Sequence, residues 1–427
     1  MTQQHPRHTS EIRAGWFLIL SACAGVACCS ITLPYYSIGM LMGPMTTHFG
    51  WSRAEFQGAL LLSSGLGALT APVVGWLCDR YGPRKVALPG LVGLTLAFFA
   101  ASHMNGELWM LYASYAAIAL LGAGTVPVTW TRSIALSFDA RRGLALGLTL
   151  TGTGIAAVLL PHYTVWAIER FGWRGAYVAV GLLPVLLAGP LVYWGFHTRT
   201  PNAATAAGYE DRYGLTLTQV LRRRRFWILL CSVLMAYLGI SGIGANLFAS
   251  LTDRGVSKSQ AATIQGIMGA AIILGRIGVG HLVDRYWAPG VVAVALSLPM
   301  LGSVLLYNNP PFWTTVLAVI LIGLAAGAEL DLMSFLAARY FGVLHYSKIY
   351  SLLYSALALC GGSAPMLFAH LYDLNGSYAQ SFLMGGAFFL IAALLMLLLG
   401  PYPSALALGA GNTQPSAPRS PCPSTPA

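Results

Sequence analysis

The stretch that decides the fold is Gly75-Trp76-Leu77-Cys78-Asp79-Arg80-Tyr81-Gly82-Pro83-Arg84-Lys85. It places a dense group of charges between two long apolar runs, 54–77 and 86–104. A helix needs about 20 mostly apolar residues to cross the roughly 30 Å of hydrocarbon in a bilayer. The stretch therefore predicts a short polar loop between two membrane-spanning helices.

The composition of the whole chain agrees with this prediction. Of its 427 residues, 56% are hydrophobic and 9% are charged, whereas a soluble protein carries about 25% charged residues. The first apolar run is longer than the core of a cleaved signal peptide, about 7–15 residues, so we expect it to be retained. The predicted spans are 14–42, 54–77, 86–104, 108–136, 143–168, 175–196, 226–249, 258–283, 290–308, 312–337, 348–372 and 380–400.

The basic residues fix the expected orientation. With the spans placed alternately, 17 of the 24 lysines and arginines fall on one side and 5 on the other, and Arg132 and Arg276 lie inside spans. The positive-inside rule then puts both termini in the cytoplasm. This distribution accounts for the net charge of +11 without nucleic-acid binding. Only three lysines against 21 arginines, with abundant alanine and glycine, suggest a GC-rich bacterium and hence its inner membrane.

An internal repeat indicates that the chain is a duplicated unit. Ser52 and Ser257 are 205 positions apart, and each is followed three residues later by Glu55 or Gln260, the pattern of a helix-capping box. Gly75, Asp79 and Arg80 recur at the same offset as Gly280, Asp284 and Arg285. The predicted fold class is an all-α membrane protein with 12 transmembrane helices in two pseudo-symmetric six-helix bundles. The predicted parts are a cytoplasmic N-terminus (1–13), a first bundle (14–196), a cytoplasmic linker (197–225), a second bundle (226–400) and a disordered cytoplasmic tail (401–427).

The decisive stretch resembles the loop between helices 2 and 3 of the major facilitator superfamily, whose pattern is G-x-x-x-D-R-x-G-x-R-K. The residues that carry this resemblance are Gly75, Asp79, Arg80, Gly82, Arg84 and Lys85, and Gly280, Asp284 and Arg285 look like a degenerate second copy. The resemblance implies that these residues form a conformational latch and do not touch substrate. Gly75 would permit close contact between helices.

A narrower resemblance points to one branch of that superfamily. Phe49-Gly50-Trp51-Ser52-Arg53, Gly172-Trp173-Arg174 and the pair Gly275-Arg276 are similar to monocarboxylate transporters and oxalate:formate antiporters. Tyr36, Ile272 and Leu357 stand where members of that branch have a lysine, an aspartate and a second lysine. Because a dicarboxylate would want two cations, a monoanion fits the single Arg276 better than oxalate does.

The charges expected inside the bilayer are the candidate site residues. Burying a charge at mid-helix costs roughly 2.5–3.5 kcal/mol on insertion scales, so such residues are functional hypotheses. Arg276 suits capture of a carboxylate by its planar guanidinium, and the alternative is a standing salt bridge with Glu329. Glu329 and Asp331 are candidates for proton coupling, and the alternative is a structural tie between helices 8 and 10.

Three further residues are candidates for substrate binding. Tyr35 and Tyr36 lie near the middle of the first span, where the resembled fold lines its cavity, although packing is the commoner role of a tyrosine. Arg132 is about five residues from the cytoplasmic end of its span, so it either contacts substrate or extends to the interface.

These patterns lead to one function and its rivals. We expect a secondary active transporter of a small organic anion, a monocarboxylate with aromatic ones included, with proton symport by alternating access. The alternative is an exchanger or exporter of the same superfamily, by organic anion antiport or drug efflux. A membrane-embedded sensor or enzyme is a third class, but no nucleotide loop, metal cluster or nucleophile triad is present in the sequence. We expect no cofactor, no metal, no nucleic acid and a monomer in the lipid bilayer.

Overall fold

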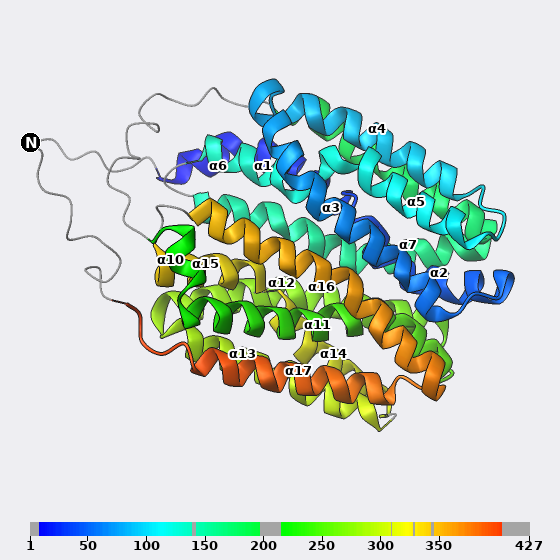
Figure 1. Cartoon of the computed structure of the whole chain (residues 1–427). Coiled ribbons are helices and arrows are strands. Elements are labelled where there is room, and N and C mark those ends of the chain that lie inside the picture. The colour runs from blue at the N-terminus through cyan, green and yellow to red at the C-terminus, as the bar shows by residue number, and fades with distance from the viewer. Residues whose placement is uncertain are drawn as a thin grey trace, which may run out of the picture.

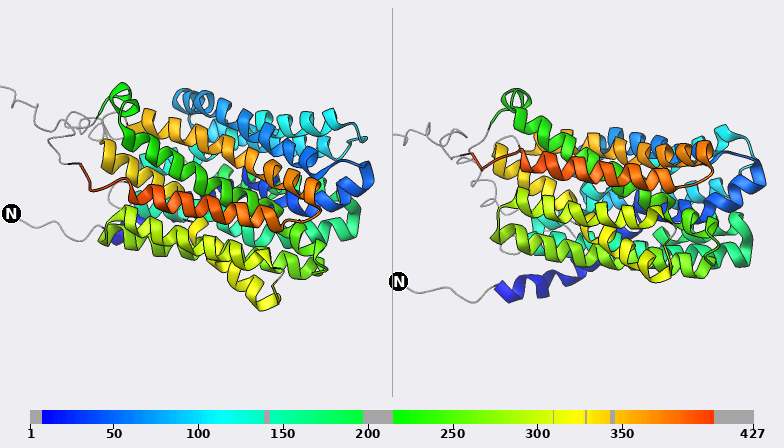
Figure 2. Two further views of the ribbon diagram at one scale, coloured as in Figure 1. Left: turned by 60° about the horizontal axis from the view of Figure 1, so that its bottom comes forward. Right: turned by 90° about the horizontal axis from the view of Figure 1, so that it is seen from below.

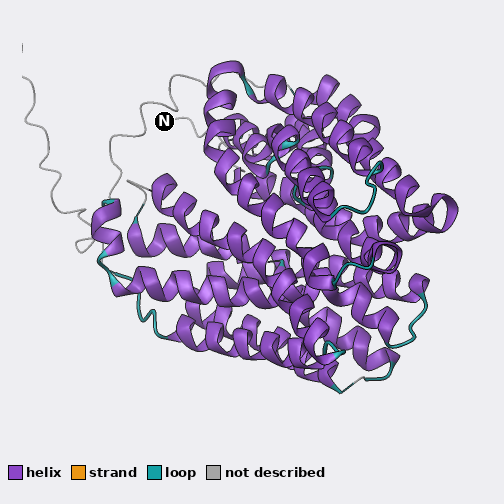
Figure 3. Ribbon diagram, turned by 45° about the vertical axis from the view of Figure 1, so that its right-hand side comes forward, coloured by secondary structure: helices purple, strands orange, loops and turns teal. Residues whose placement is uncertain are grey.

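The computed structural model describes residues 8–138, 142–196, 215–308, 310–327, 329–342 and 346–403. Within these ranges the side chains of Asp79, Asp284, Glu329 and Asp331, among a few others, lie outside the description. Every regular element in the described ranges is a helix (Figure 3). The prediction of an all-α protein is therefore confirmed.

The first half contains the helices up to residue 195. They are α1 (His8–Ala27), α2 (Thr32–Phe49), α3 (Arg53–Tyr81), α4 (Pro83–Ala101), α5 (Leu108–Leu121), the 3₁₀ turn η1 (Ala123–Thr125), α6 (Pro127–Ser137), α7 (Arg142–Leu183), the π-helical turn η2 (Pro184–Ala188) and α8 (Gly189–Gly195). The predicted first span, 14–42, is two helices, because the chain leaves helical geometry between α1 and α2. The predicted fourth span, 108–136, is likewise divided into α5, η1 and α6.

The second half repeats this arrangement after a short capped helix. Its helices are α10 (Leu217–Leu221), α11 (Arg224–Asp253), α12 (Lys258–Arg285), α13 (Ala288–Tyr307), α14 (Phe312–Ala326), α15 (Glu329–Phe341), α16 (Tyr346–Asn375) and α17 (Ala379–Leu397). The predicted tenth span, 312–337, is divided into α14 and α15. The part of the predicted linker from residue 215 onward is bound to this half, since the Leu215 amide donates to the Phe341 carbonyl at 2.9 Å.

Nine segments of the described chain are long and apolar enough to cross a membrane, or ten if the pair of helices bent by 54° at residue 122 is one span. One of the nine, Leu144–Gly195, has 52 residues and contains Gly172 at φ 69°, outside helical geometry. A helix of that length would measure about 78 Å, more than twice the hydrocarbon thickness. The predicted count of twelve stays a prediction.

The duplication is visible in where helices begin. Ser52 caps α3 by accepting from the Glu55 amide, and Glu55 returns a bond to the Ser52 amide, as predicted. Ser257 accepts from the Gln260 amide at the start of α12. The starts of α3 and α12, and of α4 and α13, are both 205 positions apart. The same local chemistry therefore starts equivalent helices in each half.

The helices of both halves run roughly along one direction, with the first half above and the second below in Figure 1. The contacts between halves join α3 to α16, α7 to α12 and α2 to α11. The start of α1, helix α10 and the described end of the chain at residue 403 lie at the same end of the molecule (Figures 1 and 2). This end is called the termini end, and the other is called the far end.

The two halves are tightly packed over part of their length. A Cβ on Gly362 of α16 would lie 2.5 Å from the Cα of Leu61 and 3.0 Å from the Cβ of Ser64 on α3. A Cβ on Gly269 of α12 would lie 2.7 Å from the Ala157 carbonyl carbon of α7. Such small residues let helix backbones approach closely.

The packing between halves is lost toward the termini end. Gly75 lies about 20° from Ser64 around α3, and Gly147 lies about 20° from Gly154 around α7, at 100° per residue. Ser64 and Gly154 both face the other half, but no described atom lies within 4 Å of a Cβ placed on Gly75 or Gly147. The prediction of a close helix contact at Gly75 is therefore not met in this structure. The halves separate toward the termini end.

Candidate functional site

The predicted tenth span is broken beside Arg276. Helix α14 ends at Ala326 with Gly327 as its cap, and α15 begins at Glu329. The break leaves helix-end carbonyls without a partner inside the helix. The Nε of Arg276, on α12, donates to the Gly327 carbonyl at 3.0 Å. A cation of one helix is thus bound to the backbone of the break in another.

Close packing holds Arg276 against this break. A Cβ on Gly275 would lie 1.9 Å from the Leu324 carbonyl oxygen, and one on Gly327 would lie 1.9 Å from the Ile272 carbonyl oxygen. Only glycine fits at either position with the backbones this close. In the Gly275-Arg276 pair, Gly275 therefore lets α12 and α14 approach closely, and Arg276 supplies the positive charge.

The guanidinium of Arg276 lies toward the other half of the molecule. Arg276 is half-buried and lies about 60° around α12 from Ile273, which packs against Gly154 of α7. Its charge is within electrostatic range of the Tyr36 hydroxyl on α2. Arg276 and Tyr36, two of the predicted substrate-binding residues, thus interact electrostatically across the two halves, and their role in binding stays a prediction.

The predicted tyrosines differ in their surroundings. The Tyr35 hydroxyl donates to the Ser241 carbonyl of α11 at 3.3 Å, so it joins the halves where α2 meets α11. The rings of Tyr35 and Tyr36 meet edge to face, with their centroids 5.0 Å apart. Tyr35 therefore has a packing role in this structure, whereas Tyr36 is within electrostatic range of Arg276.

One aromatic residue near this site was not a candidate from the sequence. Tyr354 of α16 and Tyr36 are both within electrostatic range of Cys29, which lies between α1 and α2. Tyr354 stacks on Tyr350, one helical turn earlier, with centroids 6.3 Å apart. The spacing of these two tyrosines on one helix face is the signal that could have identified them.

Arg132 lies apart from this group. It is half-buried on α6 and within electrostatic range of Cys78 on α3, next to the charged loop. Both alternatives for Arg132, contact with substrate and extension to the interface, stay predictions. Glu329 begins α15 two residues after Gly327, so its backbone is at the break that Arg276 binds. The contacts of the Glu329 and Asp331 side chains are outside the described part.

The charged loop is built as its sequence predicts. Gly82 has φ 86° and ψ 145°, a conformation that favours glycine, and Pro83 follows at the start of α4. Arg84 donates to the Tyr193 carbonyl of α8 and lies over the Tyr193 ring. Arg80 lies over the ring of Trp76. These contacts join the loop to its own half. The latch role stays a prediction for all nine residues: Gly75, Asp79, Arg80, Gly82, Arg84, Lys85, Gly280, Asp284 and Arg285.

A polar cluster joins the halves at the far end, and we call it the clasp: Arg53, Gln57, Asn246, Asp253, Tyr372, Asp373 and Tyr378. The Arg53 guanidinium of α3 binds both oxygens of Asp253 of α11, at 2.6 and 2.8 Å. It also donates to the Tyr378 hydroxyl at 3.2 Å and lies 3.8 Å above the Tyr372 ring. One arginine of the first half is thus held by three residues of the second.

Backbone and neutral side chains complete the clasp. The Asp373 carboxylate accepts from the amides of Arg53 and Ala54 at 3.2 and 2.9 Å, so the second half caps a helix of the first. The Asn246 amide oxygen accepts from Tyr378 and from Gln57, at 3.2 and 3.3 Å. Burial raises the pKa of Tyr378, so its hydroxyl keeps the proton that it donates. The clasp closes the far end.

The helix breaks were missed by the sequence reasoning, although the repeat contains their signal. Gly122, which ends α5, and Gly327, which ends α14, are also 205 positions apart, and each is followed by alanine. The same offset had been found at Ser52 and Ser257. Extending the comparison to glycines within spans would have placed a break beside Arg276.

Comparison with known proteins gives four agreeing matches. The sequence profile of the Major Facilitator Superfamily matches residues 16–328. Monocarboxylate transporter 11 of Homo sapiens is 27% identical over 369 residues, which cover 83% of this chain and 76% of that protein. Monocarboxylate transporter 13 of Bos taurus is 27% identical over 410 residues, or 90% and 89% of the two chains. The crystal structure of a D-xylose-proton symporter has the same fold, with a TM-score of 0.69 at 16% identity, and the match covers 90% of this chain and 98% of that one.

Proposed function

Because this chain belongs to the Major Facilitator Superfamily and is a membrane transporter, we propose that it carries a small organic monocarboxylate, aromatic ones included, together with a proton. The observation that supports this proposal is the position of Arg276. Its guanidinium is half-buried between the halves, within electrostatic range of Tyr36 and bound to the break between α14 and α15. The similarity to monocarboxylate transporters agrees with a carboxylate as cargo.

The chemistry of Arg276 favours a single carboxylate. A planar guanidinium binds a carboxylate through two parallel N–H···O bonds, which are charge-assisted and roughly twice as strong as neutral ones. The Nε bond to Gly327 fixes the plane of the group. Tyr36 adds an aromatic face and a hydroxyl from the other half, so an anion bound here touches both halves.

Proton coupling is assigned to Glu329, with Asp331 as the second candidate. Glu329 begins the helix after the break whose carbonyl Arg276 binds, and in this proposal an ionised Glu329 competes with the anion for the guanidinium. Protonation of Glu329 removes that competition and favours anion binding. Release of the proton restores it and drives the anion out, and this sequence couples the two fluxes.

Alternating access follows from the two ends of the molecule. The clasp closes the far end, whereas the halves separate at Gly75 and Gly147 toward the termini end. With both termini in the cytoplasm, as the basic residues predict, this structure is open to the inside. The opposite state requires the clasp to break.

The test is uptake of labelled benzoate, pyruvate and lactate into proteoliposomes with an inwardly directed proton gradient. We expect Arg276→Leu to reduce uptake at least about tenfold, the loss of one charge-assisted pair. Arg170→Leu, an exposed arginine at the end of α7's first segment, is the matched control. Glu329→Gln should keep exchange between preloaded and external anion and lose acceleration by the gradient.

Two results would contradict the proposal. Full uptake by Arg276→Leu would remove the anion site from this position. Exchange that ignores the proton gradient in the unaltered protein would favour an exchanger, the alternative that the sequence left open.

A further inference from the structure

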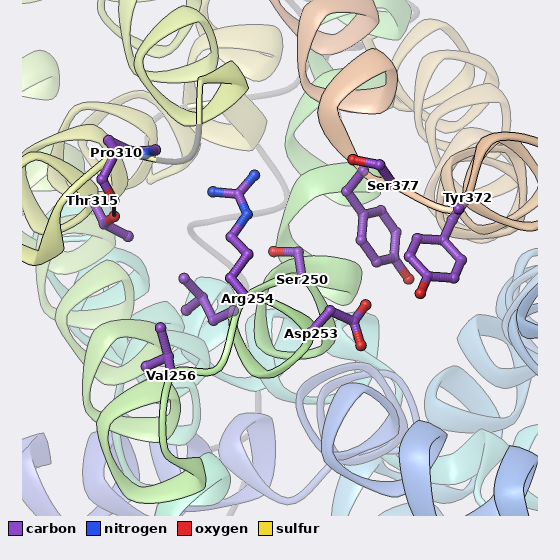
Figure 4. A pocket seen from close by; sticks show the side chains of 11 residues that line it. Ser250, Asp253, Arg254, Val256, Pro310, Thr315, Tyr372 and Ser377 are labelled. Atoms are coloured by element: carbon purple, nitrogen blue, oxygen red, sulfur yellow. Dashed lines mark hydrogen bonds between the residues drawn. The ribbon is translucent and has the colours of Figure 1, made fainter.

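A cavity that contains a cation lies outside the site proposed above. It is at the far end within the second half, has a volume of about 360 Å³, and is lined by the end of α11, the start of α14 and the connection between α16 and α17 (Figure 4). This volume falls in the range of small-molecule sites, about 300–1,000 Å³. The hydroxyl-bearing residues of its lining are Ser250, Thr315, Tyr372, Ser377 and Tyr378.

Arg254 extends into the middle of this cavity (Figure 4). It is half-buried, its Nη2 donates to the Leu306 carbonyl at 2.9 Å, and its guanidinium lies over the Phe382 ring at 5.2 Å. Burial lowers the pKa of Arg254, and the neighbouring Asp253 acts against this. The cation is therefore partly desolvated in a cavity where an anion would stabilise it.

The charge of the cavity depends on the clasp. Asp253 and Arg254 are the charged residues in its described lining, and both Asp253 oxygens are bound by Arg53. With the clasp closed, Arg53 offsets Asp253 and the cavity presents the positive charge of Arg254. When Arg53 moves away with the first half, Asp253 cancels Arg254.

We propose that this cavity is an external anion site, in which Arg254 binds a small carboxylate and the bound anion holds the clasp closed. Asp253, Tyr372 and Tyr378 belong both to the cavity wall and to the clasp. Opening the clasp therefore changes the wall as well as the charge. An anion that binds the closed form more tightly shifts the equilibrium toward it by linkage.

This site is independent of the cargo site. Arg254 is at the far end of α11, whereas Arg276 is 18 positions after the start of α12 and nearer the termini end. Because α12 rises about 1.5 Å per residue, the two sites are separated by most of that helix. An external anion would thus slow the return of the carrier to its outward-open state without occupying the cargo site.

The experiment is thermal unfolding of the purified chain in detergent, titrated with sodium benzoate against sodium chloride at constant ionic strength. In Arg276→Leu we expect a benzoate-dependent rise in Tm to remain, and adding Arg254→Gln should remove it. Val256→Trp, which fills the cavity and keeps the charge, should remove it as well. Arg170→Gln is the control, and sodium sulfate in a second series distinguishes a carboxylate site from one for inorganic anions.

The coupling to the clasp has its own variant. Arg53→Gln in the Arg276→Leu background should lower the affinity of the remaining site for benzoate about tenfold, because Arg53 no longer balances the negative charge of Asp253. An unchanged affinity would refute the coupling.

The outcomes separate this proposal from the cargo site. Loss of the whole benzoate response in Arg276→Leu overturns the external site and leaves the proposed function standing. A response that persists with both Arg254→Gln and Arg276→Leu, or with Val256→Trp and Arg276→Leu, also overturns it. If the single variant Arg254→Gln already removes the whole benzoate response, the result supports the external site and counts against benzoate binding at Arg276. A response to sulfate in place of benzoate overturns the carboxylate assignment.

Discussion

Breaking the clasp should open the far end of the transporter, and Arg53→Gln is the perturbation that shows it. The substitution removes both bonds to Asp253, the bond to Tyr378 and the contact with the Tyr372 ring. It leaves the amides of Arg53 and Ala54 bound to Asp373, because those bonds use backbone donors. The helix cap is therefore kept, and the loss is confined to the side chain.

The magnitude follows from how far solvent reaches the pair. The side chains of Arg53 and Asp253 are 18% and 29% exposed, so water screens part of their attraction. Exposed ion pairs contribute about 0.2–1 kcal/mol, and two-bond geometry places this pair at the upper end. The arginine over the tyrosine ring adds about 0.5–1 kcal/mol. A total near 1.5 kcal/mol corresponds to about a tenfold larger population with the far end open.

The assay is the labelling rate of Ser64→Cys by a membrane-impermeant thiol reagent added to right-side-out vesicles. Ser64 faces Gly362 of α16, about 16 Å along α3 from Arg53, and is covered by the packing of the two halves. If both termini are cytoplasmic, as the basic residues predict, reagent added outside reaches it only when the far end opens. The chain without Ser64→Cys gives the background from native cysteines.

The design includes a coupling test. Arg53→Gln and Asp253→Asn should each raise the labelling rate about tenfold, and the double variant should resemble either one, because the two residues act through one interaction. Arg170→Gln should leave the rate unchanged. Multiplicative effects in the double variant, or no change in Arg53→Gln, would refute the assignment of the clasp as the closure of the far end.

Three further predictions concern the backbone. Gly82→Ala should lower the free energy of unfolding by about 1–3 kcal/mol, because Gly82 has a positive φ, and thermal unfolding measures this loss. Gly75→Ala should leave the Tm unchanged, because the space around Gly75 is open. The same substitution should slow uptake if the latch closes at Gly75 in the other state of the transporter. Gly327→Ala should cost about 3 kcal/mol or more, since its Cβ would meet the Ile272 carbonyl at 1.9 Å, and Gly278→Ala, with open space, is the unfolding control. Asp373→Ala removes a helix cap worth about 1 kcal/mol, and the labelling rate of Ser64→Cys should rise by the factor that corresponds to this free energy. An unchanged labelling rate would show that the cap does not help to close the far end.

Much of the fold was predictable because bilayer thickness and local capping act on short stretches of sequence. Ser52 and Glu55 form the predicted capping box, and Gly172 turns the chain between the two spans predicted at 143–168 and 175–196. The breaks within spans were not predicted, since the runs 14–42, 108–136 and 312–337 each contain enough apolar residues to be interpreted as one continuous helix. At the first break, the Ser30 amide donates to the Thr125 hydroxyl of another helix at 3.0 Å. This hydrogen bond satisfies a backbone group that the break frees. It depends on a tertiary contact, which a hydropathy pattern does not reveal.

The site was predictable in part for the same reason. Charge inside an apolar span is a local signal, and it singled out Arg276, whose role in substrate binding stays a prediction. The clasp was not predicted, because Arg53, Asp253 and Asp373 lie at helix ends where charged residues are ordinary. Their pairing joins positions 200 and 320 residues apart. Only the arrangement of the two halves brings them together.

The two equivalent breaks show how a symmetric scaffold produces an asymmetric site. Gly122 and Gly327 end equivalent helices, and both breaks need partners for freed backbone groups. In the first half those partners are neutral, because the Trp130 ring N–H donates to the Thr125 carbonyl at 2.6 Å. In the second half the partner is the cation Arg276, whose counterpart at offset 205 is Ala71. The repeat therefore places a polar break in each half, and the two breaks differ in their partners, which are neutral groups in the first half and the cation Arg276 in the second.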